Sequence, residues 1–279
     1  MTLLAFLAGL ASAILHAGWN AATRQQPEPG NAFASVVIMA GVISVPPLLV
    51  WGFPNAQALA WMGVGAAFNV LTMRLIMATY RRTPFAIGYP MIRGTSPLAV
   101  AIIGFLLFHE ELSALGIMGI AAISTGVFLL ALSSRIGGHV DPRGLVLAVC
   151  AGLSNACFVL ADARGVRASG DILQYGFLVS IVNAILLGLL LSVEKVDVVG
   201  MMRKSWRFAL AAGAASTFSY FFILYAFTHG PIGPVAALRE TSVFFGILLA
   251  ATVLREPVGL LRWIAAGMAV GGTAMIRLS

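Results

Sequence analysis

The sequence predicts an all-α integral membrane protein with ten transmembrane helices, arranged as two inverted repeats of five helices. Three observations predict this fold: an apolar composition, ten long apolar segments, and an internal repeat. Of the 279 residues, 60% are hydrophobic and 10% are charged, whereas soluble domains average about 45–50% apolar and about 25% charged residues. A soluble fold of this composition would expose extensive apolar surface, which monomers rarely do. An ordinary soluble enzyme, a disordered protein and a disulfide scaffold are therefore excluded.

Ten apolar segments are long enough to cross a bilayer as helices, because a hydrocarbon core of about 30 Å requires roughly 20 residues. They are too long and too continuously apolar for the alternating strands of about 10 residues in a membrane β-barrel. We expect helices over 3–22, 32–52, 57–79, 84–107, 113–133, 143–163, 172–192, 206–228, 232–253 and 259–277. The first is interpreted as a span rather than a signal peptide, since no Lys or Arg precedes it.

The two halves of the chain share a pattern of polar residues. Residues 92–130 align without gaps on residues 238–276. The identical pairs are Arg93/Arg239, Thr95/Thr241, Ser96/Ser242, Glu110/Glu256, Leu115/Leu261 and Gly126/Gly272. We therefore predict two repeats, residues 1–137 and 138–279. Because each contains an odd number of helices, equivalent helices run in opposite directions, as in secondary transporters whose substrate site lies near the membrane midplane.

Two arginines at equivalent positions of the fourth and ninth segments are candidate substrate ligands. A charge near the bilayer centre costs roughly 2.5–3.5 kcal/mol, so we expect Arg93 and Arg239 to have a function there. Tyr89 and Ser96 share a helix face with Arg93, and Ser242 shares one with Arg239. A guanidinium beside hydroxyl groups suits a carboxylate. The alternative is that each arginine is a structural clamp on backbone carbonyls.

Glu240 is an intramembrane carboxylate without an acidic counterpart, because the equivalent position in the first repeat is Gly94. It is a candidate ligand for the ammonium group of an amino acid, or a proton carrier. The alternative is that it neutralises Arg239 or Arg93.

The first segment places His16, Trp19 and Asn20 on one helix face, where they are candidate pocket residues. His16 is also a candidate for proton coupling, since histidine titrates near neutral pH. A plain interhelical hydrogen bond for His16, an interfacial position for Trp19 and a capping role for Asn20 are the alternatives. Secondary pocket candidates are Asn69, Tyr80 and Asn155.

Proline occurs in both equivalent segments, as expected for bent or broken helices at a transporter binding site. These prolines are Pro84, Pro90, Pro97, Pro231 and Pro234. Glu110 and Glu256 end the same two segments, beside His109 and Arg255. We interpret each glutamate as one member of a salt bridge in its loop, where the bridge latches a gate. The alternative is that both glutamates lie in solvated loops.

The two five-helix halves, the run Leu15-His16-Ala17-Gly18-Trp19-Asn20 and the acidic ends of the fourth and ninth segments resemble the drug/metabolite transporter (DMT) superfamily. Within it the sequence is most similar to the EamA-like exporters, and among these to the YddG-type amino-acid exporters. The resemblance covers essentially the whole chain. It implies export of amino acids or related small metabolites, but it assigns no binding site residue by residue.

We therefore predict a secondary transporter, not an enzyme, that exports amino acids or related zwitterions by alternating access from a central cavity. Arg93 and Arg239 would bind the carboxylate and Glu240 the ammonium group. Export of organic anions or drugs is the alternative. A membrane enzyme or a channel is less favoured, since no nucleophile–base pair or metal-ligand cluster is apparent. We expect no cofactor, no metal and no nucleic-acid partner; the substrate and the lipid bilayer are the expected partners, and a monomer is compatible with the sequence.

Lys and Arg are concentrated in the odd-numbered gaps between segments. These gaps carry Arg24, Arg81, Arg82, Arg135, Arg143, Lys195, Arg203, Lys204, Arg207 and Arg255, whereas the other gaps and the C-terminal end carry Arg164, Arg167 and Arg277. The positive-inside rule then places the odd-numbered gaps in the cytoplasm and both ends of the chain on the external side of an inner (plasma) membrane. The resemblance implies cytosolic ends instead, and we follow the charge count.

Overall fold

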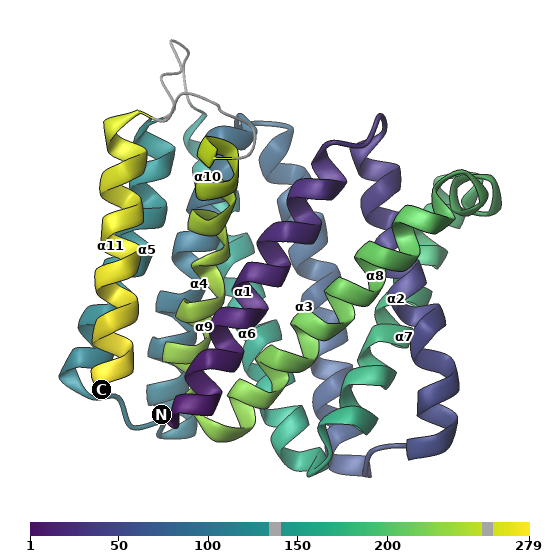
Figure 1. Cartoon of the computed structure of the whole chain (residues 1–279), viewed down its shortest axis with the longest axis horizontal. Helices are drawn as coiled ribbons and strands as arrows, with labels where there is room; N and C mark the ends of the chain where they lie inside the picture. The colour runs from purple at the N-terminus through teal and green to yellow at the C-terminus, as the bar shows by residue number, and fades with distance from the viewer. Residues whose placement is uncertain (134–140, 253–258) are drawn as a thin grey trace.

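The computed structural model describes residues 1–133, 141–252 and 259–279, and within these ranges the chain is helical, with no strand (Figure 1). The helices are α1 (Leu3–Arg24), α2 (Pro29–Trp51), α3 (Ala56–Tyr80), α4 (Phe85–Phe108), α5 (Ala114–Ser133), α6 (Pro142–Ser169), α7 (Ile172–Val193), α8 (Val198–His229), α9 (Ile232–Glu240), α10 (Ser242–Thr252) and α11 (Leu260–Leu278). Eight described helices, α1 to α8, are long and apolar enough to cross a membrane. The all-helical membrane class is thereby confirmed.

Two expected gaps are shorter than predicted, because α6 continues to Ser169 and α8 begins at Val198. Helix α6 ends where Gly170 adopts a left-handed conformation with φ of 71°, which favours glycine. Helix α8 starts early because the Asp197 side chain accepts a hydrogen bond from the N–H of Gly200 at 2.9 Å and caps the helix. Basic residues that we expected in loops therefore lie on helices.

The segment expected as one helix over 232–253 is divided at Thr241 into α9 and α10. Both the hydroxyl and the N–H of Thr241 donate to the Leu238 carbonyl, at 2.6 and 3.1 Å, and such local bonds compete with the helical ladder. The break does not fall at the prolines. Pro231 and Pro234 lie at the start of α9, where a missing N–H is tolerated. The division lies directly after Arg239 and Glu240.

The helices pack in pairs that combine the first and second parts of the chain. Helix α3 packs on α6, α1 on α8, α2 on α7 and α5 on α11, while α4 lies between α5, α6 and α9. Figure 1 shows α5 and α11 at one side of the bundle and α2 and α7 at the other. As a result, α1, α4, α6, α8 and α9 meet in the middle.

Small residues permit the closest of these contacts. A Cβ atom built on Gly119 of α5 would lie 2.7 Å from the carbonyl oxygen of Gly272 on α11, and the reverse holds for Gly272. Such close approach of backbones is typical of packed membrane helices. Large apolar side chains instead face outward: Leu49 and Val50 of α2 are 74% and 78% exposed, as expected for a surface covered by lipid.

Candidate functional site

A cavity of about 740 Å³ lies between α1, α2, α3, α4, α6, α7, α8 and α9. It extends from the middle of the bundle to the end at which α1 finishes and α2 begins, where Arg24, Pro29 and Gly30 line it. Tyr80 and Phe85, at the adjoining ends of α3 and α4, line the same mouth. Its volume lies in the range of small-molecule sites.

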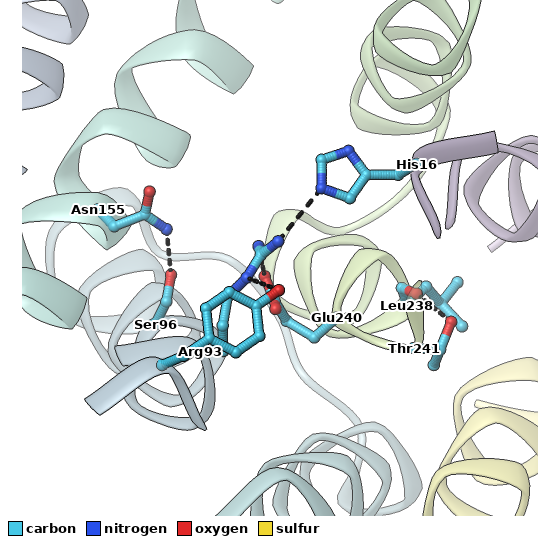
Figure 2. Close-up of polar contacts among 8 residues, drawn as sticks. His16, Arg93, Ser96, Asn155, Leu238, Glu240 and Thr241 are labelled. Atoms are coloured by element: carbon cyan, nitrogen blue, oxygen red, sulfur yellow. Dashed lines mark hydrogen bonds and ion pairs between the residues drawn. The ribbon is translucent and has the colours of Figure 1, made fainter. Parts of the chain in front are cut away.

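Each of the three nitrogens of the Arg93 guanidinium has a polar partner inside this region (Figure 2). Its Nη1 lies 3.0 Å from Oε1 of Glu240, and its Nη2 lies 3.2 Å from Nε2 of His16. Its Nε donates to the Tyr89 hydroxyl at 3.3 Å. Arg93, His16 and Tyr89 also line the cavity. This side chain therefore holds α1, α4 and α9 together.

Arg239, which aligns with Arg93 in the sequence, is in the opposite situation. It lines the cavity, its Nε is buried, and that nitrogen has no hydrogen-bond partner. Within the described residues no ion pair includes Arg239, although Asp162 and Glu240 lie close enough to attract its charge. The cavity therefore contains an arginine whose bonding capacity is unused.

Three expected pocket residues do not line the cavity: Ser96, Glu240 and Ser242. Glu240 is directed to Arg93 (Figure 2). An ammonium group bound by Glu240, as predicted, would have to compete with Arg93 for this carboxylate. The Ser96 hydroxyl faces α6 and accepts a hydrogen bond from Asn155 at 2.8 Å. Ser242 is 4% exposed, in the first turn of α10 beyond the break at Thr241.

The other expected residues line the cavity, and much of its wall is aromatic. Trp19 lies edge-on to His16 with ring centroids 5.1 Å apart, and its buried Nε1 has no partner. Asn20 donates to the His16 carbonyl at 2.8 Å. The aromatic wall comprises Trp19, Phe33, Tyr80, Phe85, Tyr89, Phe158 and Tyr220. A flat apolar group fits such a wall.

Three polar contacts at or beside the wall connect helices that the sequence could not pair. Asn69 of α3 donates to Asn183 of α7 at 2.9 Å, and both residues line the cavity. The sequence reasoning omitted Asn183, although a single amide inside an apolar segment was a usable signal. Tyr220 donates to Oδ2 of the buried Asp162 at 2.5 Å, and Tyr175 donates to Oδ1 at 3.0 Å.

The opposite end of the bundle is closed by Glu110 and Arg167. Arg167 donates to Oε1 of Glu110 at 2.5 Å and to the carbonyls of Phe227 and Gly230 at 2.8 and 2.7 Å. The second carboxylate oxygen of Glu110 accepts from the N–H of Ile232 at 3.0 Å. The predicted salt bridge of Glu110 is therefore present. Arg135, Arg255 and Glu256 lie outside the described residues.

Residues 142–278 match the EamA-like transporter family, so an EamA-like transporter domain is present in the second part of the chain. A search of curated proteins finds no match. Among solved structures, a chain described as "Crystal structure of protein" is similar with a TM-score of 0.75 and 18% sequence identity, covering 98% of this chain and 96% of that chain. At this identity the likeness shows the fold alone. The family match indicates a multi-pass membrane transporter.

Proposed function

We propose that this protein exports amino acids or related small zwitterionic metabolites by alternating access from the central cavity. The observation that carries the proposal is Arg239, a partly buried residue that lines the cavity and whose buried Nε has no partner. A guanidinium binds a carboxylate through two parallel hydrogen bonds. An unpaired charge inside a membrane protein is costly and is a functional candidate for that reason.

The cavity wall supports a substrate that has an apolar body as well as a carboxylate. Trp19, Tyr80 and Phe158 offer ring faces, while Asn69 and Asn183 offer amide groups. For an amino acid, the ammonium group would be bound by ring faces and amide oxygens rather than by Glu240. Because Glu240 is bonded to Arg93, organic anions without an ammonium group are the second candidate substrate.

Alternating access between two repeats is supported by the symmetry of helix packing. Exchanging α1 with α6 and α3 with α8 converts the contact of α3 with α6 into the contact of α8 with α1, and both contacts are extensive. Exchanging α2 with α7, and α5 with α11, in the same way leaves the α2–α7 and α5–α11 contacts unchanged. Two five-helix repeats, residues 1–137 and 138–279, and a ten-span count with α9 and α10 as one span fit this pattern.

The charge distribution supports an orientation for export. The mouth of the cavity lies at the end that carries Arg24, Arg81 and Arg82, which the positive-inside rule assigns to the cytoplasm. The open cavity would then accept a cytoplasmic substrate, and the Glu110–Arg167 closure would separate it from the exterior. An inner (plasma) membrane location is part of the same proposal.

The test is transport by purified protein in liposomes loaded with labelled amino acids and, separately, labelled organic acids. Arg239→Gln should reduce efflux about 10- to 100-fold, because a hydrogen bond to a charged group contributes about 1.5–3 kcal/mol. Arg74→Gln is the matched control, since Arg74 is exposed on α3 and does not line the cavity. Unchanged efflux by folded Arg239→Gln protein would overturn the proposal. Efflux of organic acids alone would select the second candidate.

A further inference from the structure

A second pocket, of about 790 Å³, lies beside the mouth of the central cavity, between the α1–α2 connection and the start of α8. The two pockets have no lining residue in common. This pocket is lined by Gln26, Pro27, Glu28, Asn31, Ala32, Val196, Asp197, Gly200, Met201, Arg203, Lys204, Ser205, Trp206, Arg207 and Phe208. Nothing in the transport proposal uses it.

Three cations of this pocket have no anionic partner in the part of the chain that the structure describes. Arg203, Lys204 and Arg207 are exposed, and none of them forms an ion pair there. The two carboxylates of the pocket are bonded to neutral donors. Asp197 caps α8 through the N–H of Gly200, and Glu28 accepts from the Asn31 amide. The three cations therefore remain available to an external anion.

The length of α8 locates these cations near the membrane surface. With 32 residues, α8 is about 48 Å long, whereas the hydrocarbon core is about 30 Å thick. Helix α8 runs obliquely through the bundle, which accounts for part of the excess, and its basic residues occur within the first three turns, at one end of the helix (Figure 1). Trp206, which is 51% exposed and has Arg207 over its ring at 5.4 Å, marks the interface on this segment.

Exposed apolar side chains flank the cations on the same helix. Val199 is 62% exposed and Leu210 is also exposed. A ligand in this pocket would therefore contact the three cations at the depth of the lipid headgroups. It would also contact the apolar side chains that lie next to these cations on α8. Phospholipids have this combination, and clusters of Lys and Arg at the end of a membrane helix attract anionic headgroups.

We infer that the pocket at the start of α8 binds the phosphate of an anionic phospholipid. Arg203, Lys204 and Arg207 contact the headgroup, and its acyl chains lie along the apolar surface of α8. The α1–α2 connection forms the second wall, so the lipid contacts both segments. This inference does not depend on the identity of the transported substrate.

Native mass spectrometry of the purified, delipidated protein tests the inference with phosphatidylglycerol, phosphatidylcholine and inorganic phosphate as probes. Phosphatidylglycerol should bind at least about tenfold more tightly than phosphatidylcholine. The triple variant R203Q/K204Q/R207Q should lose this preference. The control R81Q/R82Q/R143Q removes three exposed cations from the same end of the bundle and should retain it.

Equal binding of the two lipids, or the same preference in both triple variants, would overturn the inference. Complete displacement of phosphatidylglycerol by an equal concentration of inorganic phosphate would show a free-anion site and would also overturn it. Should the triple variant fail to fold, the single variants R203Q and R207Q are compared in the same way, each with an expected partial loss of the preference.

Discussion

Arg93 and Arg239 occupy equivalent positions of the sequence repeat, yet their surroundings differ. Arg93 bonds to Glu240, His16 and Tyr89, while the buried Nε of Arg239 has no partner. The difference arises because one carboxylate, Glu240, lies beside the two arginines and forms its ion pair with Arg93. At Gly94, the position equivalent to Glu240, a Cβ atom would lie 2.6 Å from the Phe128 ring.

A carboxylate at position 94 would therefore require the Phe128 ring to move. Two arginines at aligned positions can therefore have different partners when a neighbouring position holds an acid beside only one of them. The two arginines share an aligned position in the sequence. Their surroundings differ because their partners differ.

The strongest test of this comparison is the stability of Arg93→Gln against that of Arg239→Gln. Removing Arg93 leaves Glu240 as an unpaired buried carboxylate, which should cost about 3–5 kcal/mol of unfolding free energy. Removing Arg239 breaks no bond in the described structure and should cost far less. Denaturant unfolding in detergent measures both. The double variant R93Q/E240Q should recover part of the loss, and equal costs for the two single variants would contradict the distinction.

A smaller effect is expected where the wall of the cavity meets Asp162. Tyr220→Phe and Tyr175→Phe each remove one hydrogen bond to the same buried carboxylate and should each cost about 1–3 kcal/mol. Tyr220 lines the cavity and Tyr175 does not. Transport should therefore change in Tyr220→Phe and stay near the original rate in Tyr175→Phe. Identical transport in both variants would indicate that Tyr220 does not contact the substrate.

The smallest effect is expected from Arg239→Lys, which keeps the charge but loses the planar fork. If two parallel hydrogen bonds to a carboxylate are important, the concentration for half-maximal transport should rise about tenfold, equivalent to about 1.4 kcal/mol. Initial rates over a range of substrate concentrations measure it. A lysine variant with unaltered half-saturation would show that charge alone is required.

The membrane class and most helices could be predicted from the sequence because apolar length decides them. Helix ends were harder, since they depend on individual groups such as the Asp197 cap and the left-handed Gly170. The sequence predicts one helix over 232–253, with proline as the expected cause of any bend, whereas the structure divides it into α9 and α10 at Thr241. There a side-chain hydroxyl competes with the helical hydrogen bonds. A hydropathy pattern contains no information about such hydrogen bonds, so it does not predict the break.

The cavity could be predicted in part. His16, Trp19, Asn20, Tyr89, Arg93 and Arg239 line it as expected, because polar groups in apolar helices need a polar interior. The pairing of Glu240 with Arg93 was left open, since helix spacing does not determine which of two cations a carboxylate reaches across an interface. Ser96 and Ser242 were misplaced because a shared helix face was equated with a shared cavity.

The closure by Glu110 and Arg167 has a consequence for divergence among related sequences. Three of its four bonds end on backbone groups, namely the carbonyls of Phe227 and Gly230 and the N–H of Ile232. Substitutions along α8 and α9 leave those groups in place. The side chains that these helices present to the cavity can therefore change, and new substrates can be acquired, while the closed end keeps its bonds. Only Glu110 and Arg167 need to be retained for it.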